Sequence, residues 1–222
     1  MTQYYQDFQE RPRNKLFFDI ETLPADDENK DIAIELTISK LITKNGKTKI
    51  TKKLRDYIFR QTAISGDFGR IFCIGYAINN EVVNIISGEE RQILVKWWQI
   101  ADRADLFVGH NIMDFDLRFI FKRSIIHKIK PAAKHLNLSF ARYRNYPIFD
   151  TMREWEKWSS SFIKLDTLAK ILNLPSSKDG GIDGSQVYDF YLGGEFERIY
   201  EYCKRDVVLT RDIYNRMVFG NV

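Results

Sequence analysis

The sequence lacks the features that would place it in a membrane or an oxidising compartment. Among its 222 residues there are only two cysteines, Cys73 and Cys203, and they do not form a C-x-x-C pair. No apolar run approaches the length of about 18 residues that suggests a transmembrane helix. Residues 1–14 are polar, where a secretory signal would be apolar. These absences indicate a reducing, cytoplasmic setting and no membrane partner.

Acidic residues are missing from one long segment. Between Asp116 and Asp150 there is none, whereas eight basic residues lie there: Arg118, Lys122, Arg123, Lys128, Lys130, Lys134, Arg142 and Arg144. This segment carries +8, and because the whole chain carries +4, the remainder carries −4. Such asymmetry is typical of a protein that binds a phosphate backbone, and the alternative is a solvated basic face. Several of these cations alternate with Phe140, Tyr143 and Tyr146, a pattern that suits a single strand of nucleic acid.

The composition is that of a globular protein with a substantial core. Hydrophobic residues make up 44% and charged residues 29% of the chain. Without internal repeats or low-complexity tracts, we expect residues 1–222 to form a single domain, with a polar arm at 1–14 and a charged insertion at 25–66. The role of the insertion is open, and its apolar patches at 32–41 and 54–64 suit short helices or strands.

The order of the other predicted elements indicates an α/β fold, a central mixed sheet flanked by helices. We expect strands at 16–23, 68–79, 81–87 and 105–109, and helices at 89–104, 117–126, 151–158, 164–172, 186–191 and 195–217. The strands at 68–79 and 81–87 form an antiparallel hairpin. The first strand, which is acidic, is central to the argument about function.

Two carboxylates interrupt the apolar run from Leu16 to Pro24. Asp19 and Glu21 are two residues apart, so on a strand their side chains point to the same face. Carboxylates held so close repel each other and need a cation or a shared proton. Oxygen ligands suit Mg²⁺ or Mn²⁺. The alternative, two acids on the solvated end of a strand, is equally compatible with so short a pattern.

Three further residues strengthen the first interpretation. Asp116 opens a helix directly after a strand, a usual location for functional groups in α/β sheets. Tyr202 and Asp206 are four residues apart in the last helix and so share one face. Asp114 competes with Asp116 for the same role, and both also suit the first turn of a helix as capping residues.

Together these residues resemble a known set of motifs. Phe-Asp19-Ile-Glu21-Thr22, Gly109-His-Asn111-x-x-x-Phe115-Asp116 and Tyr202-Cys-x-x-Asp206-Val are similar to the three exonuclease motifs of DEDD 3′–5′ exonucleases. The similarity is greatest to the proofreading domain of family B DNA polymerases and its stand-alone relatives. Since position 202 is Tyr and position 201 is Glu, where another subgroup has His, the chain resembles the DEDDy type.

The resemblance implies a ribonuclease H-like three-layer fold and a metal-dependent hydrolase that releases nucleoside monophosphates from the 3′ ends of single-stranded DNA, as in proofreading or repair. It implies two Mg²⁺ or Mn²⁺ ions, bridged by Asp19. Glu21 and Asp206 would complete the nucleophile-side site, and Asp116 would bind the other ion largely through water. Tyr202 would orient the attacking water, and its ordinary phenol pKa near 10 favours positioning over proton abstraction.

Substrate contacts are less specific in the sequence. By resemblance, Thr22 and Leu23 fall where family members contact the terminal nucleotide. Asn111 either binds substrate or holds a turn, and Lys178 lies in a glycine-rich loop as a possible phosphate contact. We expect Asp150 to cap the helix that begins at Thr151.

Two other functions fit the same residues. RNase D-like 3′–5′ exoribonucleases share the tyrosine version of the motifs, and the sequence does not show how the 2′-hydroxyl would be treated. A nucleic-acid-binding module without turnover is the alternative from another class. It would be favoured by the loss of a ligand residue, and none of the four acids is missing.

Overall fold

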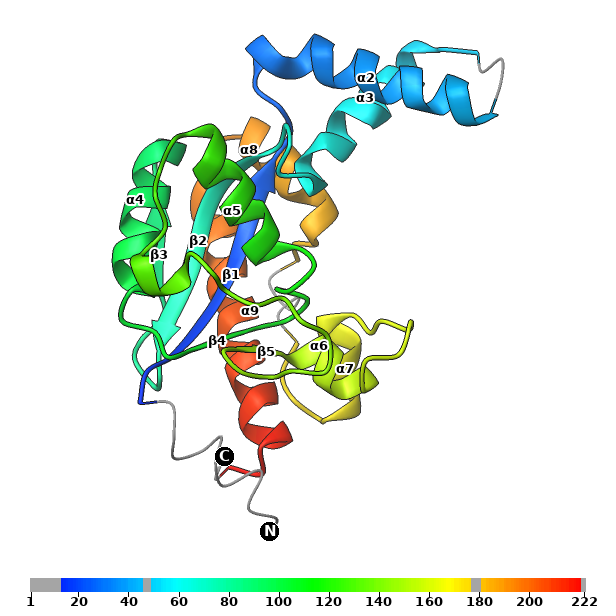
Figure 1. Cartoon of the computed structure of the whole chain (residues 1–222). Helices are drawn as coiled ribbons and strands as arrows, with labels where there is room; N and C mark the ends of the chain where they lie inside the picture. The colour runs from blue at the N-terminus through cyan, green and yellow to red at the C-terminus, as the bar shows by residue number, and fades with distance from the viewer. Residues whose placement is uncertain (1–12, 46–48, 177–180, 221–222) are drawn as a thin grey trace.

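Five strands form one mixed sheet in the order β3-β2-β1-β4-β5. The structure, a computed structural model, describes residues 13–45, 49–176 and 181–220. The strands are β1 (Lys15–Leu23), β2 (Arg70–Ile78), β3 (Asn84–Ser87), β4 (Leu106–Gly109) and β5 (Ile148–Asp150). The acidic strand β1 is central, antiparallel to β2 and parallel to β4 (Figure 1).

Helices cover both faces of this sheet. They are α2 (Asp27–Asn45), α3 (Lys52–Gln61), α4 (Glu90–Ala101), α5 (Asp116–Ile126), α6 (Thr151–Glu156), α7 (Leu165–Ile171), α8 (Val187–Leu192) and α9 (Phe196–Met217). Short 3-10 turns are η1 (Thr62–Ile64), η2 (Ala133–His135) and η4 (Gly184–Gln186). Helix α9 packs on β1, β2 and β4, while α4 packs on β2 and β3 from the other side. Within the described residues, no helix combines the length and apolar character needed to cross a bilayer.

The alternation of side chains along β1 builds the two halves of the core. Phe18 points to the α4 side, where its ring centroid lies 4.7 Å from that of Trp97. Phe17 points to the α9 side and meets Tyr214 edge to face at 5.4 Å. Asp19 and Glu21 continue the Phe17 series, so the period of two directs both carboxylates toward α9.

Most predicted elements are confirmed, with two differences. The insertion at 25–66 forms an antiparallel pair of helices, α2 and α3, that extends from the end of β1 (Figure 1). Strand β5 was not predicted, because three residues are too short to show a period, and only pairing with β4 makes them a strand. The polar arm predicted at 1–14 lies largely outside the described residues.

Close packing of α9 on the sheet depends on the absence of a side chain at Gly75. This residue pairs with Asp19 across β1 and β2. A Cβ atom added there would lie 2.8 Å from Cys203 Sγ and 3.1 Å from Val207 Cγ2, both on α9. The glycine therefore sets how near α9 approaches the acidic strand.

We expect Gly75→Ala to destabilise the protein by about 1–3 kcal/mol, because α9 or β2 must shift to relieve this overlap. Urea unfolding followed by circular dichroism measures the effect. Gly193→Ala is the matched control, since its added Cβ would have its nearest neighbour at 3.4 Å. Equal stability of the two variants would contradict the packing argument.

Candidate active site

Asp19 and Glu21 lie side by side on β1 and face the last helix. Glu21 is buried and Asp19 is half-buried. Helix α9 brings Tyr202, Cys203 and Asp206 to the same place, all of them buried. Cys203 Sγ lies 3.6 Å from the backbone oxygen of Asp19 and 3.8 Å from its Oδ2 atom. Residues about 180 positions apart in sequence therefore meet in one polar cluster inside an otherwise apolar layer.

Asp116, the first residue of α5, joins this cluster from the side of β1 on which β4 lies. Pairing between β1 and β4 ends at Phe17 and Val108, so β4 offers no partner to the amide of Ile20. The Asp116 carboxylate accepts a hydrogen bond from that amide at 3.1 Å, and its side chain is 2% exposed. The carboxylate thus occupies the place where β4 would have continued, which fixes it beside the acidic strand.

The structure separates Asp116 from its rival Asp114. Asp114 is exposed and forms ion pairs with Arg118 and Arg153. It therefore has its charge balanced at the surface, while Asp116 is buried among other acids. The geometry brings Asp19, Glu21, Asp116 and Asp206 together, as the sequence predicts, and leaves Asp114 out.

Burial and mutual repulsion dominate the electrostatics of the cluster. Loss of solvation, followed by the charges of Asp116 and Asp206, raises the pKa of Asp19 well above its usual range. Burial and then Asp19 raise the pKa of Glu21 in the same way. Burial raises the pKa of Asp116 to about 7. Each shift shows that negative charge is disfavoured here unless a cation accompanies it.

The donor set fits hard divalent cations. Asp19, Glu21 and Cys203 can each offer a ligand atom, and these atoms lie within 4.8 Å of one another. A hydrogen bond to Cys73, together with burial, raises the pKa of the Cys203 thiol, so it keeps its proton and is a poor ligand. Carboxylate oxygens remain, and these suit Mg²⁺ or Mn²⁺. Asp116 and Asp206 add two more carboxylates to the same cluster.

Tyr202 is placed to donate a hydrogen bond. Burial, then the negative charges of Asp206 and Glu21, raises its pKa far above the ordinary phenol value, and its hydroxyl bonds to Asp206. The phenol is therefore protonated at any working pH. This supports a positioning role for Tyr202 and argues against proton abstraction.

The predicted substrate contacts are spread around the cluster. Thr22 donates its hydroxyl hydrogen to the backbone oxygen of Ala63 at 2.7 Å, and Leu23 is buried in the core beside Tyr202. Asn111 adopts a positive φ of 65°. Its backbone carbonyl accepts hydrogen bonds from the amides of Asp114 and Phe115, so its backbone holds a turn. Lys178 lies outside the described residues.

The prediction that Asp150 caps a helix is confirmed, and its role is wider. Its carboxylate accepts from the amides of Met152 and Arg153 in α6, at 3.0 and 3.2 Å. It also accepts from the amides of Asn111 and Met113, both at 2.9 Å. One carboxylate therefore ties the turn that leads into Asp116 to the start of α6.

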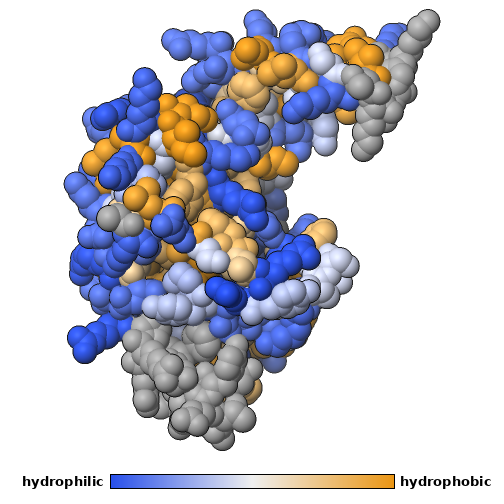
Figure 2. Space-filling model, in the orientation of Figure 1, coloured by the Kyte–Doolittle hydropathy of each residue, from blue (hydrophilic) through white to orange (hydrophobic). Residues whose placement is uncertain are grey.

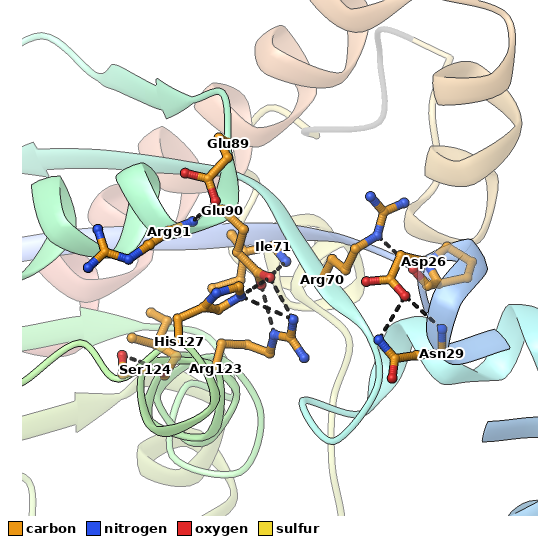
Figure 3. A network of polar contacts seen from close by, with 12 residues as sticks. Asp26, Asn29, Arg70, Ile71, Glu89, Glu90, Arg91, Arg123, Ser124 and His127 are labelled. Atoms are coloured by element: carbon orange, nitrogen blue, oxygen red, sulfur yellow. Dashed lines mark hydrogen bonds and ion pairs between the residues drawn. The ribbon is translucent and has the colours of Figure 1, made fainter. Parts of the chain in front are cut away.

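Sequence reasoning missed a second supporting carboxylate, Glu90, shown in Figure 3. Opposite Glu21 and Thr22 the β1–β2 register shifts by one residue, because Phe72 lies unpaired between Ile71 and Cys73. Glu90 Oε1 accepts from the amide of Ile71 at 2.7 Å. Arg123 binds both oxygens of Glu90, at 2.9 and 2.7 Å, and is buried. The contact links the irregular part of β2 to α5, the helix that begins at Asp116.

This contact corrects one sequence interpretation. Arg123 was grouped with the basic residues that suit a nucleic-acid strand, but it is committed to an internal ion pair. Lys122 is likewise paired with Asp67, and Arg118 with Asp114. The local sequence around Glu90 and Arg123 gives no signal of their pairing, because 33 positions separate them.

Comparisons with known proteins agree with this geometry. A family described as "Predicted 3'-5' exonuclease related to the exonuclease domain of PolB" matches residues 71–221. The match includes Asp116, Tyr202 and Asp206 and leaves β1 and the helices α2 and α3 outside. A search of curated proteins finds no match.

Among solved structures, the chain is similar to the family B DNA polymerase from the hyperthermophilic archaeon Pyrobaculum calidifontis. The TM-score is 0.60 and the sequence identity 13%, over 93% of this chain and 24% of the polymerase. The chain thus spans about a quarter of the polymerase it matches. At this identity the similarity concerns the fold, and it confirms the predicted ribonuclease H-like α/β architecture.

The raised pKa of Asp116 predicts an unusual pH dependence of stability. Without metal, the folded protein keeps the Asp116 proton up to pH about 7, whereas the unfolded chain releases it near the ordinary value of 3.8. The folded state binds more protons in this window, so stability falls as the pH rises through it. Asp116→Asn keeps an acceptor for Ile20 and removes the charge. In EDTA it should exceed wild type by roughly 1–3 kcal/mol at pH about 8 and match it near pH 4.

Urea unfolding of both proteins across this pH range measures the difference. Asp114→Asn serves as the control, because Asp114 is exposed and ion-paired. Parallel profiles for wild type and Asp116→Asn would show that Asp116 does not carry the effect.

Breaking the internal ion pair should be costly. Glu90→Gln leaves the buried Arg123 without a counter-charge, and we expect a loss of about 2–4 kcal/mol in the free energy of unfolding. Glu89→Gln is the matched control, since Glu89 is exposed and caps α4 only through the amide of Arg91. Thermal unfolding compares the two, and similar melting temperatures would refute a stabilising role for the pair.

Proposed function

This chain belongs to the family of 3′–5′ exonucleases related to the exonuclease domain of PolB, and we propose that it hydrolyses phosphodiester bonds at the 3′ ends of single-stranded DNA. The observation that carries the proposal is the convergence of Asp19, Glu21, Asp116 and Asp206 from β1, α5 and α9. Family membership supplies the class of reaction, and the acid cluster supplies a place for it. The products would be nucleoside monophosphates.

Two Mg²⁺ or Mn²⁺ ions held by these four carboxylates would activate a water molecule and stabilise the leaving 3′ oxygen. The chain's own contribution is to hold the carboxylates in place. Asp19 and Glu21 are fixed by the central strand, and Asp116 by its hydrogen bond to Ile20. Asp206 follows Tyr202 by one turn of α9.

Tyr202 would orient the attacking water. Its hydroxyl stays protonated because its pKa is raised by burial and by the neighbouring acids. It can therefore donate to Asp206 and accept from a water, and it has no proton-abstracting form at neutral pH. Thr22 and Asn111 would border the terminal nucleotide, where the backbone around Thr22 and the turn at Asn111 have fixed shapes. Leu23 is buried, so it would support Tyr202 from the core and would not contact the nucleotide.

The test uses 5′-labelled single-stranded DNA and RNA of matched sequence, each with Mg²⁺, Mn²⁺ or EDTA. Wild type should produce a ladder that shortens from the 3′ end, with either metal and not with EDTA. Asp19→Ala should abolish the ladder and still bind the strand, because it removes a metal ligand and leaves the surrounding surface intact.

Asp114→Ala is the matched control, since it removes an acid close to Asp116 in sequence that lies outside the cluster. It should cleave like wild type. Cleavage by Asp19→Ala at the wild-type rate would contradict the proposal that the acid cluster is the active site. Tight binding by wild type with no ladder under either metal would favour a binding module, and a ladder on RNA alone would favour an exoribonuclease.

A further inference from the structure

The helices α2 and α3 form a projecting arm, defined here as residues 27–61. The two helices pack antiparallel around a small apolar core that includes Ala33, Ile34, Ile38, Ile58 and Phe59. The arm extends away from the sheet, and the space-filling view shows the molecule hollowed beneath it (Figures 1 and 2). Helix α2 has 19 residues, which corresponds to a length of about 28 Å. The family match begins at residue 71, after the arm.

The base of the arm is fixed to the candidate active site. Thr22, next to Glu21, donates to the backbone oxygen of Ala63 directly after α3. The amide of Ala25 donates to Thr62 Oγ1 at 2.8 Å. Arg60 near the end of α3 pairs with Asp189 of α8 at 2.9 Å. These contacts set the direction of the arm relative to the acidic strand.

Charge is distributed unevenly along the arm. The sequence 26–35 contains five acids, Asp26, Asp27, Glu28, Asp31 and Glu35. The sequence 36–55 contains none, and its basic residues are Lys40, Lys44, Lys47, Lys49, Lys52, Lys53 and Arg55. The arm is therefore acidic near its base and basic toward its tip.

Three of the lysines are free to bind an external anion. Lys49, Lys52 and Lys53 are exposed, and none has an ion-pair partner among the residues that the structure describes. Arg55 differs, because it pairs with Glu35 at 2.7 Å. Lys52 and Lys53 also open α3, where the helix dipole adds partial positive charge. This concentrates an unbalanced positive charge at the tip of the arm.

We propose that Lys49, Lys52 and Lys53 bind the phosphate backbone of duplex nucleic acid upstream of the 3′ end that occupies the acid cluster. This inference rests on the proposed exonuclease function. Proteins that hold a single strand stack successive bases on several aromatic side chains. The aromatic residues of the arm are Tyr57, which is exposed one turn after Lys53, and Phe59, which is buried in its core. Several lysines around a single exposed ring suit a duplex, whose bases are stacked inside and whose phosphates face outward. Lys52 and Lys53 open α3, whose 10 residues span about 15 Å, so at about 3.4 Å per base pair they lie roughly four base pairs from the base of the arm.

Binding is measured by fluorescence anisotropy in EDTA, so that no substrate is cut. Three DNAs are compared: a tetranucleotide, a hairpin duplex of about 16 base pairs with the same tetranucleotide as a 3′ tail, and a single strand of equal total length. Wild type should bind the tailed duplex at least tenfold more tightly than the tetranucleotide.

The test variant is Lys52→Glu/Lys53→Glu. Glutamates in the first turn of a helix are favourable, so α3 should remain stable. We expect the variant to lose most of the preference for the tailed duplex and to bind the tetranucleotide like wild type. The slope of log affinity against log salt should fall by about 1 for each lysine.

Two controls separate local contact from general charge. Lys52→Arg/Lys53→Arg keeps the charge and should bind like wild type. Arg91→Glu/Lys96→Glu makes the same change in charge at two exposed residues of α4 and should also keep the preference. An unchanged preference in Lys52→Glu/Lys53→Glu, or an equal loss on the long single strand, would overturn the proposal.

The same samples with Mg²⁺ test the chemistry separately. If the tailed duplex is bound through the arm but never shortened, the exonuclease function fails while the arm contact stands. If the tail is shortened equally by wild type and Lys52→Glu/Lys53→Glu at low substrate concentration, the exonuclease stands and the arm proposal fails.

Discussion

The repulsion among four carboxylates is the constraint on which the rest of the structure depends. Asp19, Glu21, Asp116 and Asp206 come from three elements and meet where water is largely excluded, so each disfavours the charge of the others. Without cations, the cluster opposes folding. The fold tolerates it because the sheet and α9 bury large apolar surfaces on both sides of β1, and a divalent ion would turn the penalty into binding energy.

The same interaction occurs three times around the cluster: a carboxylate accepts hydrogen bonds from backbone amides. Asp116 binds the amide of Ile20 where β4 stops, and Glu90 binds the amide of Ile71 where the β1–β2 register shifts. Asp150 binds the amides of the turn between β4 and α5. In each case a buried or half-buried carboxylate accepts hydrogen bonds from backbone amides at an irregular point of the sheet. The irregular backbone next to the acids is thereby held by hydrogen bonds, as the regular strands are.

The arm separates two tasks in space. Its base shares contacts with β1 and α8, which link it to the strand that carries Asp19 and Glu21. At the other end of α3, about 15 Å away in helix length, Lys52 and Lys53 have no ion-pair partner among the residues that the structure describes. In such an arrangement the chemistry depends on geometry at the acid cluster, and affinity depends on long-range charge at the tip. Salt would then affect binding far more than the catalytic step.

The sequence by itself determined most of the helices and strands and singled out the acids of the candidate site. The period of two in β1 placed Asp19 and Glu21 on one face, and the i, i+4 spacing paired Tyr202 with Asp206, because both patterns are local properties of the backbone. Only the tertiary structure decided between Asp114 and Asp116, withdrew Arg123 from the basic surface and revealed Glu90 as a support. Each of these depends on which residues meet across the sheet, and side-chain pairing between distant segments leaves no mark on either segment alone.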